Sequence, residues 1–370
     1  MTLATTALLA YCRAGFENEC AKELAVLAAD ASLDGFVRSK PGAAFVEFVL
    51  HAPVEDDALR SRFHFRDLVF ARQLVRAIGW IRDLPATDRV SALMPAIEGI
   101  GVCFGAVVLE TADTNEAKEL STFCRQFAKP LGARLRATAL LDETQSALPR
   151  LHLFFAGSTA VCIGISDPDN SSPWPMGVPR LSMPRQAPSR STQKLAEALQ
   201  WFLAPEADRD LLHEGITAVD LGAAPGGWTW QLVRRGVYVT AVDNGPMDPA
   251  LIATGQVEHI RADGFSFRPR RPVDWMVCDI VEQPIRVAPL VASWLAEGHC
   301  THTIFNLKLP MKKRFDEVAR CRAAMEDIWS GAGVRCRLRF RQLYHDREEV
   351  TGYAFRVDDR RKKIARRRDS

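Results

Sequence analysis

Apolar and polar positions follow two periods along the C-terminal half of the chain. Short apolar runs rich in β-branched residues, typical of buried parallel strands, alternate with stretches of helical spacing. The runs are 217–221, 237–243, 257–260, 273–279 and 303–308, the helical stretches are 191–202, 228–235 and 315–329, and the segments 336–341 and 350–357 alternate as a closing antiparallel pair. This order predicts an α/β, doubly wound sheet over residues 189–357, which binds its ligand beyond the carboxyl ends of the strands.

The N-terminal half predicts two smaller α+β units. Residues 1–55 show a strand (8–13), a helix (16–29) and a strand (44–50), which suits a ferredoxin-like unit. Residues 56–166 predict strands at 68–75 and 106–111, helices at 90–99 and 115–128, and a hairpin of 151–155 with 160–165. Asp113 and Thr114 are candidate caps for the second helix. Four arginines near the first of these strands (Arg62, Arg66, Arg72 and Arg76) indicate either an RNA-binding surface or a solvated face.

Two further segments have unusual compositions. Residues 167–188 contain six prolines, which exclude both a helix and a central strand and predict a fairly stiff linker. The tail, 358–370, carries seven cations within residues 360–368. Such density suits contacts with nucleic-acid phosphates, although a solubilising tail is the alternative.

Composition narrows the cellular setting. The 370 residues are 47% hydrophobic and 25% charged, with a net charge of +3, as in an ordinary soluble protein. The nine cysteines include no Cys-x-x-Cys pair, which argues against a disulfide framework or zinc ribbon and for a reducing, cytoplasmic location. Residues 1–10 are apolar but too short to span a bilayer and lack a basic leader, so we expect a strand and no membrane association.

The candidate chemistry begins at a glycine turn. Residues Gly222 to Gly227 connect an apolar strand to a helix, so a ligand can approach the backbone closely at the positive end of the helix dipole. Asp243 ends the next strand, about 20 residues on, where an acid is expected to bind the ribose hydroxyls of a nucleotide-like cofactor. Pro225 and the glycine spacing depart from a dinucleotide fingerprint. A purely structural turn is the alternative interpretation.

This turn, with Asp243 and the later Asp263-Gly264, resembles motif I of S-adenosylmethionine-dependent methyltransferases. Further motifs resemble the FtsJ-like ribose 2′-O-methyltransferases: Pro188-Ser-Arg-Ser-Thr-Gln-Lys-Leu195, Asp220-Leu-Gly-Ala-Ala-Pro-Gly-Gly-Trp228, Val242-Asp-Asn-Gly-Pro-Met247, Trp275-Met-Val-Cys-Asp279, Phe305-Asn-Leu-Lys-Leu-Pro-Met-Lys-Lys313 and Tyr344-His-Asp-Arg-Glu-Glu-Val-Thr351. The segment 110–125 resembles the core of a THUMP domain, a family that implies RNA binding.

The resemblance implies a Rossmann-like methyltransferase that moves a methyl group from S-adenosylmethionine to the ribose of a cytidine in the peptidyl-transferase region of 23S rRNA. The implied catalytic residues are Lys194, Asp279, Lys308 and Glu349, with Glu348 as the alternative fourth member. The implied cofactor-binding residues are Ser191, Gly222, Ala224, Pro225, Gly226, Gly227, Asp243, Asp263 and Asp279. The family turn often begins with Cys-Pro; here Ala224 replaces the cysteine, another small residue.

The residue types suit this chemistry even without the family resemblance. Asp279 and Lys308 each end a strand, so both should point into the ligand cleft. Lys308 is a candidate base for the ribose hydroxyl if burial, Lys194 and the sulfonium of the cofactor lower its pKa. Asp279 opposes that shift and is better suited to orienting Lys308, while Lys194 could stabilise negative charge. The alternative without a catalytic role is that Lys308 forms an ordinary ion pair with Asp279.

Other functions fit these residues less well. Base N-methyltransferases carry an Asn/Asp-Pro-Pro-aromatic loop, which residues 279–284 lack, and Cys278, the candidate nucleophile of a cytosine-C5 enzyme, should face the core. Residues 299–302 are interpreted as a loop without a metal. A non-catalytic RNA-binding protein with a relic fold would not need the three ionic residues, and a small-molecule methyltransferase would not need the N-terminal half. We expect a monomer acting on naked or early-assembling 23S rRNA.

Overall fold

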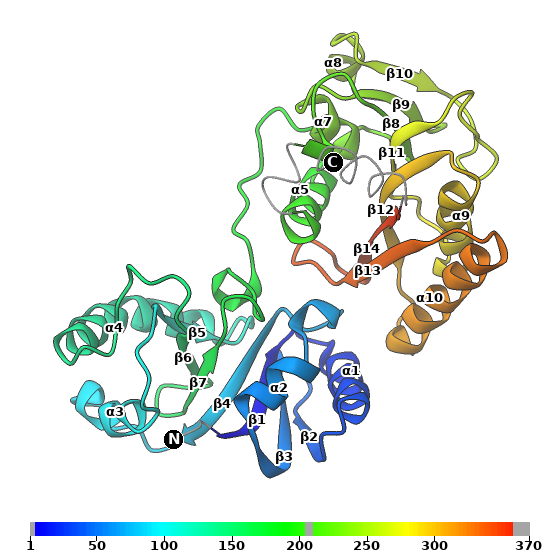
Figure 1. The fold of residues 1–370 in the computed structure, drawn as a ribbon. Helices are drawn as coiled ribbons and strands as arrows, with labels where there is room; N and C mark the ends of the chain where they lie inside the picture. Colours follow the sequence, from blue (N-terminus) through cyan, green and yellow to red (C-terminus); the bar gives the residue numbers. More distant parts are fainter. Residues whose placement is uncertain (1–3, 204–209, 358–370) are drawn as a thin grey trace, which may run out of the picture. The chain divides into compact units, whose positions relative to one another are not determined.

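The structure is a computed structural model that describes residues 4–203 and 210–357. The chain divides into two compact units, Met1–Pro179 and Arg180–Ser370, shown in Figure 1. The predicted linker, 167–188, contains one short 3-10 helix, η2 (Pro175–Gly177), and no α-helix or strand, as its prolines predicted. The predicted basic tail, 358–370, lies outside the described residues.

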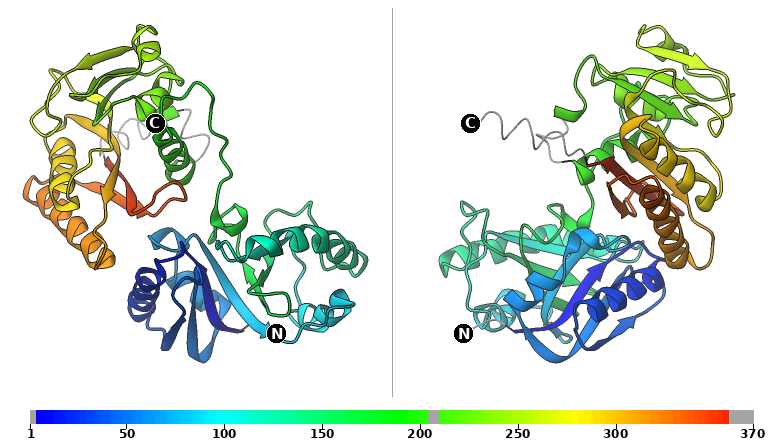
Figure 2. Two further views of the ribbon diagram at one scale, coloured as in Figure 1. Left: turned by 180° about the vertical axis from the view of Figure 1, so that it is seen from behind. Right: turned by 45° about the vertical axis from the view of Figure 1, so that its right-hand side comes forward.

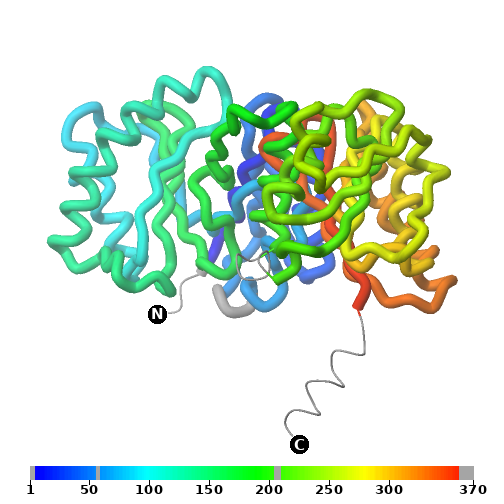
Figure 3. The backbone as a smooth tube through the Cα atoms, turned by 90° about the horizontal axis from the view of Figure 1, so that it is seen from above, coloured from blue at the N-terminus to red at the C-terminus, as the bar shows by residue number. Residues whose placement is uncertain are grey.

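One seven-stranded sheet forms the centre of the first unit, in the order β2-β3-β1-β4-β7-β6-β5. The strands are β1 (Ala4–Tyr11), β2 (Gly35–Ser39), β3 (Phe45–Glu55), β4 (Gln73–Ile81), β5 (Ala106–Thr111), β6 (Arg150–Phe155) and β7 (Val161–Ser166), and the helices are α1 (Glu17–Asp30), α2 (Asp56–Arg62), α3 (Arg89–Glu98) and α4 (Lys118–Ala137). Strand β4 pairs with both β1 and β7 and so joins the two predicted N-terminal units in one sheet. Figures 2 and 3 show the chain from other sides. The predicted 151–155 and 160–165 hairpin is confirmed.

The strand predicted at 68–75 was placed too early. It begins at Gln73, and the preceding residues form a 3-10 turn, η1 (Phe65–Asp67), and an irregular segment. The buried carboxylate of Glu23 on α1 accepts hydrogen bonds from the backbone N–H groups of Val69, Phe70 and Ala71, at 2.6 to 3.1 Å. These donors are therefore unavailable to a sheet ladder, although the segment is rich in apolar residues as a strand would be.

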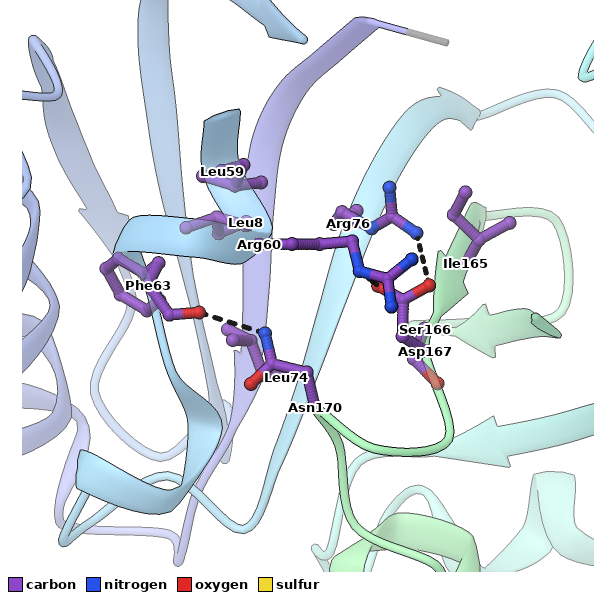
Figure 4. A pocket seen from close by; sticks show the side chains of 10 residues that line it. All are labelled: Leu8, Leu59, Arg60, Phe63, Leu74, Arg76, Ile165, Ser166, Asp167 and Asn170. Carbon is purple, nitrogen blue, oxygen red and sulfur yellow. Dashed lines mark hydrogen bonds and ion pairs between the residues drawn. The ribbon is translucent and has the colours of Figure 1, made fainter. Parts of the chain in front are cut away.

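Two of the four arginines noted in this region lie inside the unit. Arg72 pairs with Asp113 at 2.8 Å and Arg76 with Asp167 at 3.0 Å, and both arginines are buried. Figure 4 shows Arg76 and Asp167 beside a cavity of about 20 Å³, room for a single water molecule. Arg72 and Arg76 are thus neither a solvated face nor an RNA-binding surface, because both are buried and each is paired with a carboxylate.

A buried polar network holds the sheet and the linker together. Glu110 on β5 accepts hydrogen bonds from the Tyr11 hydroxyl at 2.7 Å, from His152 Nδ1 at 2.8 Å, and from the backbone N–H of Met176. His152 Nε2 lies 2.8 Å from the Ser166 hydroxyl. Burial raises the pKa of Glu110, but His152 and these donors outweigh it and leave the pKa below its usual value. The carboxylate is therefore ionised and multiply hydrogen-bonded in the interior.

Replacing Glu110 by alanine is expected to lower the free energy of unfolding of the first unit by roughly 3 kcal/mol at pH 7, because Tyr11 and His152 lose their buried acceptor. Since the folded pKa is depressed, this stabilisation is present above the unfolded value of about 4.3 and is lost as pH falls through the folded value. Urea unfolding measures it. Glu143→Ala, which removes an exposed partner of Arg136, should leave the midpoint unchanged. Equal midpoints for Glu110→Ala and wild type would contradict the prediction.

The second unit is the predicted doubly wound sheet, in the order β10-β9-β8-β11-β12-β14-β13. The strands are β8 (Thr217–Leu221), β9 (Tyr238–Val242), β10 (Val257–Ile260), β11 (Val273–Cys278), β12 (Cys300–Lys308), β13 (Cys336–Arg341) and β14 (Glu349–Arg356), and the helices are α5 (Ser191–Phe202), α7 (Gly227–Val233), α8 (Pro249–Ile252), α9 (Pro284–Ala296) and α10 (Arg314–Gly331). The first five strands are parallel, and β14 and β13 close the sheet antiparallel. Helices α5 and α7 cover one face and α9 and α10 the other (Figure 1).

Two details differ from the sequence-based expectations. Residues 300–302 are not a loop, because Cys300 starts β12, and His302 stacks on Trp275 with ring centroids 4.9 Å apart. Helix α9 was not anticipated, since Pro284 and Pro289 obscured its pattern; Pro284 occupies the first turn, where no backbone donor is needed. Within the described residues no helix is long and apolar enough to cross a membrane.

Candidate functional site

The carboxyl ends of four neighbouring parallel strands bring the predicted residues to one edge of the sheet. Strand β8 leads into the glycine turn, β9 ends one residue before Asp243, β11 ends one residue before Asp279, and Lys308 is the last residue of β12. Adjacent parallel strands deliver their last residues to a common edge. The sheet order therefore explains why these residues, spread over almost 90 positions, can share a site.

A cavity of about 490 Å³ opens at this edge. Six of the predicted cofactor-binding residues line it: Ser191, Gly222, Ala224, Pro225, Asp243 and Asp279. Five further lining residues escaped the sequence analysis as cofactor contacts: Ser189, Ala223, Trp228, Ile280 and Val281. The first three stand inside quoted motifs, whereas Ile280 and Val281 follow Asp279 in a loop without any distinctive pattern. The cavity thus combines apolar walls with a few polar groups, as small-molecule sites do.

Gly226 and Gly227 lie behind this lining rather than on it. Gly226 has φ of 117°, and a Cβ there would overlap the Leu251 side chain. A Cβ at Gly227 would overlap the hydroxyls of Ser189 and Ser191, both of which line the cavity. These two glycines therefore shape the cavity by allowing close packing of the turn against α5 and α8.

Asp243 and Asp263 occupy different positions. The Asp243 carboxylate accepts hydrogen bonds from the backbone N–H groups of Ala224 (3.0 Å) and Gly245 (2.7 Å) and lines the cavity. Asp263 is exposed, lies outside the lining, and accepts a hydrogen bond from the backbone N–H of Phe265. The structure thus brings Asp243 into the cavity and leaves Asp263 at its periphery.

Two buried polar atoms beside the cavity lack a hydrogen-bond partner within the described part of the chain: Asp220 Oδ1 and Trp228 Nε1. Asp220 is the penultimate residue of β8, and its other oxygen accepts a hydrogen bond of 2.6 Å from the Thr229 hydroxyl. Burial raises the pKa of Asp220 to about 7, despite the opposing effect of Thr229. Buried polar atoms are seldom left unpaired. The donor and acceptor, with the apolar walls and Asp243, fit a ligand such as S-adenosylmethionine that is both polar and apolar.

The four predicted catalytic residues meet in one ionic cluster. Lys194 on α5 donates to both oxygens of Glu349 (2.8 and 2.7 Å) and lies 3.8 Å from Asp279 Oδ2. Lys308 donates to Asp279 Oδ1 and, at 2.9 Å, to Glu349 Oε2. The side chains of all four are mostly buried, at 14 to 19% exposed. Glu348 instead pairs with Arg314 at 2.6 Å and is 55% exposed. The geometry therefore selects Glu349 over Glu348 as the fourth member.

A second set of buried polar groups holds the cluster in place. Asn306 donates to Asp279 Oδ1 (3.1 Å) and to Glu349 Oε2 (2.9 Å), and its own Oδ1 lies 2.7 Å from the Thr351 hydroxyl. Thr351 also lies 3.0 Å from Asp346 Oδ2. Asn306 was not predicted as a site residue. It stands two residues before Lys308 and therefore faces the same side of β12. That period-two spacing was the signal that could have identified it.

The charges in the cluster decide the direction in which the pKa values of Lys308 and Glu349 shift. Burial lowers the pKa of Lys308, but Asp279 and Glu349 together outweigh it and raise that pKa above its usual value. Burial likewise raises the pKa of Glu349, and Lys308 and Lys194 more than reverse this and lower it. Burial thus lowers the pKa of Lys308 as expected, but within these side chains the two carboxylates, including the opposing Asp279, exceed that effect.

Other chemistries have little support at this edge. Cys278 is fully buried, and burial raises the pKa of its thiol to about 12, so it packs in the core as predicted and is not a nucleophile. No group of three or more His, Cys, Asp or Glu side chains within residues 4–203 and 210–357 is arranged to hold a metal ion.

The packing at Gly227 yields a direct test of the cavity. Gly227→Ala is expected to weaken binding of S-adenosylhomocysteine about tenfold or more, because the new methyl group displaces Ser189 and Ser191 from the lining. Isothermal titration calorimetry measures the affinity. Gly331→Ala is the matched control, since a Cβ there meets no atom within 4 Å. Unchanged affinity for Gly227→Ala would show that the cavity is not the cofactor site.

Comparison with known proteins matches all three parts of the chain. A family model described as "RlmM ferredoxin-like domain" matches residues 5–75, one described as "Ribosomal RNA large subunit methyltransferase M, N-terminal" matches 88–167, and one described as "FtsJ-like methyltransferase" matches 187–319. These ranges agree with the ferredoxin-like and methyltransferase folds expected from the sequence.

Two curated relatives resemble the chain over nearly its whole length, and both are called "Ribosomal RNA large subunit methyltransferase M". The protein of Methylococcus capsulatus is 53% identical over 94% of this chain and 97% of its own. That of an Azoarcus species is 51% identical over 95% of this chain and 96% of its own. A solved structure, fibrillarin of Aeropyrum pernix with bound S-adenosylmethionine, is 12% identical, with a TM-score of 0.32 over 55% of this chain and 81% of that chain.

Proposed function

This chain belongs to the family of ribosomal RNA large subunit methyltransferase M, and we propose that it methylates the ribose 2′-hydroxyl of a cytidine in the peptidyl-transferase region of 23S rRNA. As an FtsJ-like methyltransferase it uses S-adenosylmethionine as its cofactor. The observation that carries the proposal is the position of Asp279, which lines the cofactor cavity and also binds Lys308 of the ionic cluster. We therefore propose that the methyl group is delivered beside this cluster.

The ionic cluster suits transfer to a hydroxyl oxygen. A ribose hydroxyl is a weak nucleophile and must lose its proton during attack, and bound cofactor supplies an electrophilic methyl carbon on a positively charged sulfur. We assign the removal of that proton to Lys308, with Asp279 orienting the lysine and the hydroxyl. Lys194, held by Glu349, stabilises the negative charge that develops on the oxygen. Asn306 fixes both carboxylates and thereby the alignment on which the rate depends.

The raised pKa of Lys308 predicts the pH dependence of the reaction. A lysine with a raised pKa is mostly protonated at neutral pH, but it must be neutral to accept a proton. As long as the pH is below the pKa, the neutral fraction grows about tenfold for each unit by which the pH rises. We therefore expect kcat/KM to keep rising through the alkaline range with a slope near one on logarithmic axes. Initial rates between pH 6 and 10 measure this. A plateau from about pH 6 upward would assign the proton to a carboxylate instead.

The N-terminal unit is proposed to bind the RNA. The segment 110–125, with its resemblance to a THUMP core, leads into helix α4, whose surface carries exposed cations at Lys118, Arg125, Lys129, Arg134 and Arg136. A basic helix face of this kind attracts phosphates. We propose that a monomer of the protein acts in the cytoplasm, on naked or early-assembling rRNA.

Methyl transfer from labelled S-adenosylmethionine to protein-free 23S rRNA tests the proposed function. A 2′-O-methyl group blocks alkaline cleavage of the adjacent bond, so we expect the label at one alkali-resistant cytidine. Label at an alkali-sensitive site would mean base methylation. Cofactor binding without any labelled RNA, either free or in assembling particles, would favour a non-catalytic RNA-binding protein.

A further inference from the structure

Two apolar side chains in the loops that follow β11 and β12 are unusually exposed. Val281 and Met311 are each 87% exposed, whereas the other large hydrophobic side chains on the described surface reach at most 53%. An apolar side chain that remains in solvent contributes no hydrophobic stabilisation to the folded state. Two of them in the loops that border a catalytic cluster indicate a surface that is covered when substrate binds.

The sheet brings the two side chains to the same edge. Val281 follows Asp279 by two residues in the loop after β11, and Met311 follows Lys308 by three in the loop after β12. Strands β11 and β12 are adjacent and parallel, and Asp279 and Lys308 are hydrogen-bonded to each other. The two loops therefore leave the sheet from neighbouring points. Val281 also lines the cofactor cavity, so its loop borders both the cofactor and the substrate side.

Cations follow Met311 directly. Lys312 and Lys313 are exposed and form no ion pair with any other described residue. Lys313 has φ of 58°, a left-handed conformation that is uncommon for a residue with a long side chain. Such backbone is often found where a functional side chain is positioned. The loop therefore offers an apolar contact and two uncompensated positive charges within three consecutive residues.

We propose that Val281 and Met311 clamp the unstacked base of the target nucleotide, while Lys312 and Lys313 bind its flanking phosphates. This inference rests on the proposed function. If the 2′-hydroxyl lies at Lys308, the base, attached to the neighbouring ribose carbon, must lie next to the cluster. Enzymes that act on single nucleotides of RNA splay the base out of its stack, and the exposed base then needs an apolar contact. Methionine adapts to such a flat surface without hydrogen-bonding to it.

Kinetics on transcribed 23S rRNA give the first test. Met311→Ala is expected to lower kcat/KM about fivefold and the Val281→Ala, Met311→Ala double variant about 30-fold, from the apolar area they no longer bury. Met311→Leu should retain most activity, and S-adenosylhomocysteine affinity should not change for Met311→Ala. Tyr238→Ala is the matched control, because this exposed side chain lies at the start of β9, the opposite end of the sheet from the site.

An abasic substrate identifies the group that the clamp contacts. In a fragment whose target nucleotide keeps its ribose but lacks its base, wild type should lose about the same 30-fold, and the double variant should lose nothing further. If the loss from removing the base and the loss from the double variant multiply, the clamp is overturned but the proposed function stands. The same holds if the double variant is as active as wild type on the intact substrate. A loss confined to assembled particles would assign the two side chains to a ribosomal protein instead. If wild type itself methylates no ribose, the proposed function fails, and the clamp fails with it.

Discussion

Lys308→Ala is expected to lower the rate of methyl transfer by about three orders of magnitude, the scale of a lost proton acceptor. Lys308 belongs to the ionic cluster and not to the cavity lining, so S-adenosylhomocysteine should still bind with nearly unchanged affinity. Single-turnover rates and calorimetric binding measure the two effects separately. Comparable losses of rate and of cofactor affinity would mean that the variant disrupts the cavity rather than the chemistry.

A second substitution separates the proton acceptor from a fixed cation. Lys308→Arg keeps the positive charge beside Asp279 and Glu349, but a guanidinium does not lose its proton in proteins. We therefore expect Lys308→Arg to be nearly as inactive as Lys308→Ala. Substantial activity in the arginine variant would show that Lys308 acts only as a cation. Arg320→Ala, which removes an exposed charge of α10 paired with Glu317, controls for the positive charge lost in Lys308→Ala and should retain full activity.

Glu349→Gln is expected to reduce activity about 100-fold and to destabilise the second unit by roughly 3 kcal/mol at pH 7. Glu349 is the partner of both lysines and of Asn306, so the variant leaves Lys194 and Lys308 sharing the single carboxylate of Asp279. Urea unfolding and methyl-transfer rates measure the two losses. Glu348→Gln is the matched control, one residue away and exposed, and it should leave both quantities near those of wild type. The opposite ranking would exchange the roles of the two glutamates.

The stability lost in Glu349→Gln should itself depend on pH. The folded pKa of Glu349 is lowered, so its contribution is present above the unfolded value of about 4.3 and disappears as pH falls through the folded value. The difference in unfolding free energy between wild type and variant should therefore shrink as the solution is acidified below about pH 4. A difference that stays constant down to pH 2 would mean that packing, and not charge, explains it.

The sequence by itself determined the architecture of the second unit and named the charged residues that the structure brings together in the ionic cluster. Parallel buried strands are continuous apolar runs, so β8, β9, β10 and β11 could be located almost to the residue. The glycine turn and the strand-end positions of Asp279 and Lys308 follow from the same local pattern. Where local rules failed, a distant group had intervened. The Glu23 carboxylate accepts the backbone hydrogen bonds before β4, and the carboxylates of Asp113 and Asp167 pair with Arg72 and Arg76.

Only the tertiary structure decided how the charges of the site combine. Lys194 and Glu349 are 155 residues apart, and their contact depends on α5 lying beside the first residue of β14. The choice of Glu349 over Glu348, the role of Asn306, the position of Asp263 outside the cavity and the raised pKa of Lys308 all follow from that assembly. The physical reason is that electrostatic effects depend on distance and burial in space. A one-dimensional pattern can name the charged groups but cannot give the separations that set their balance.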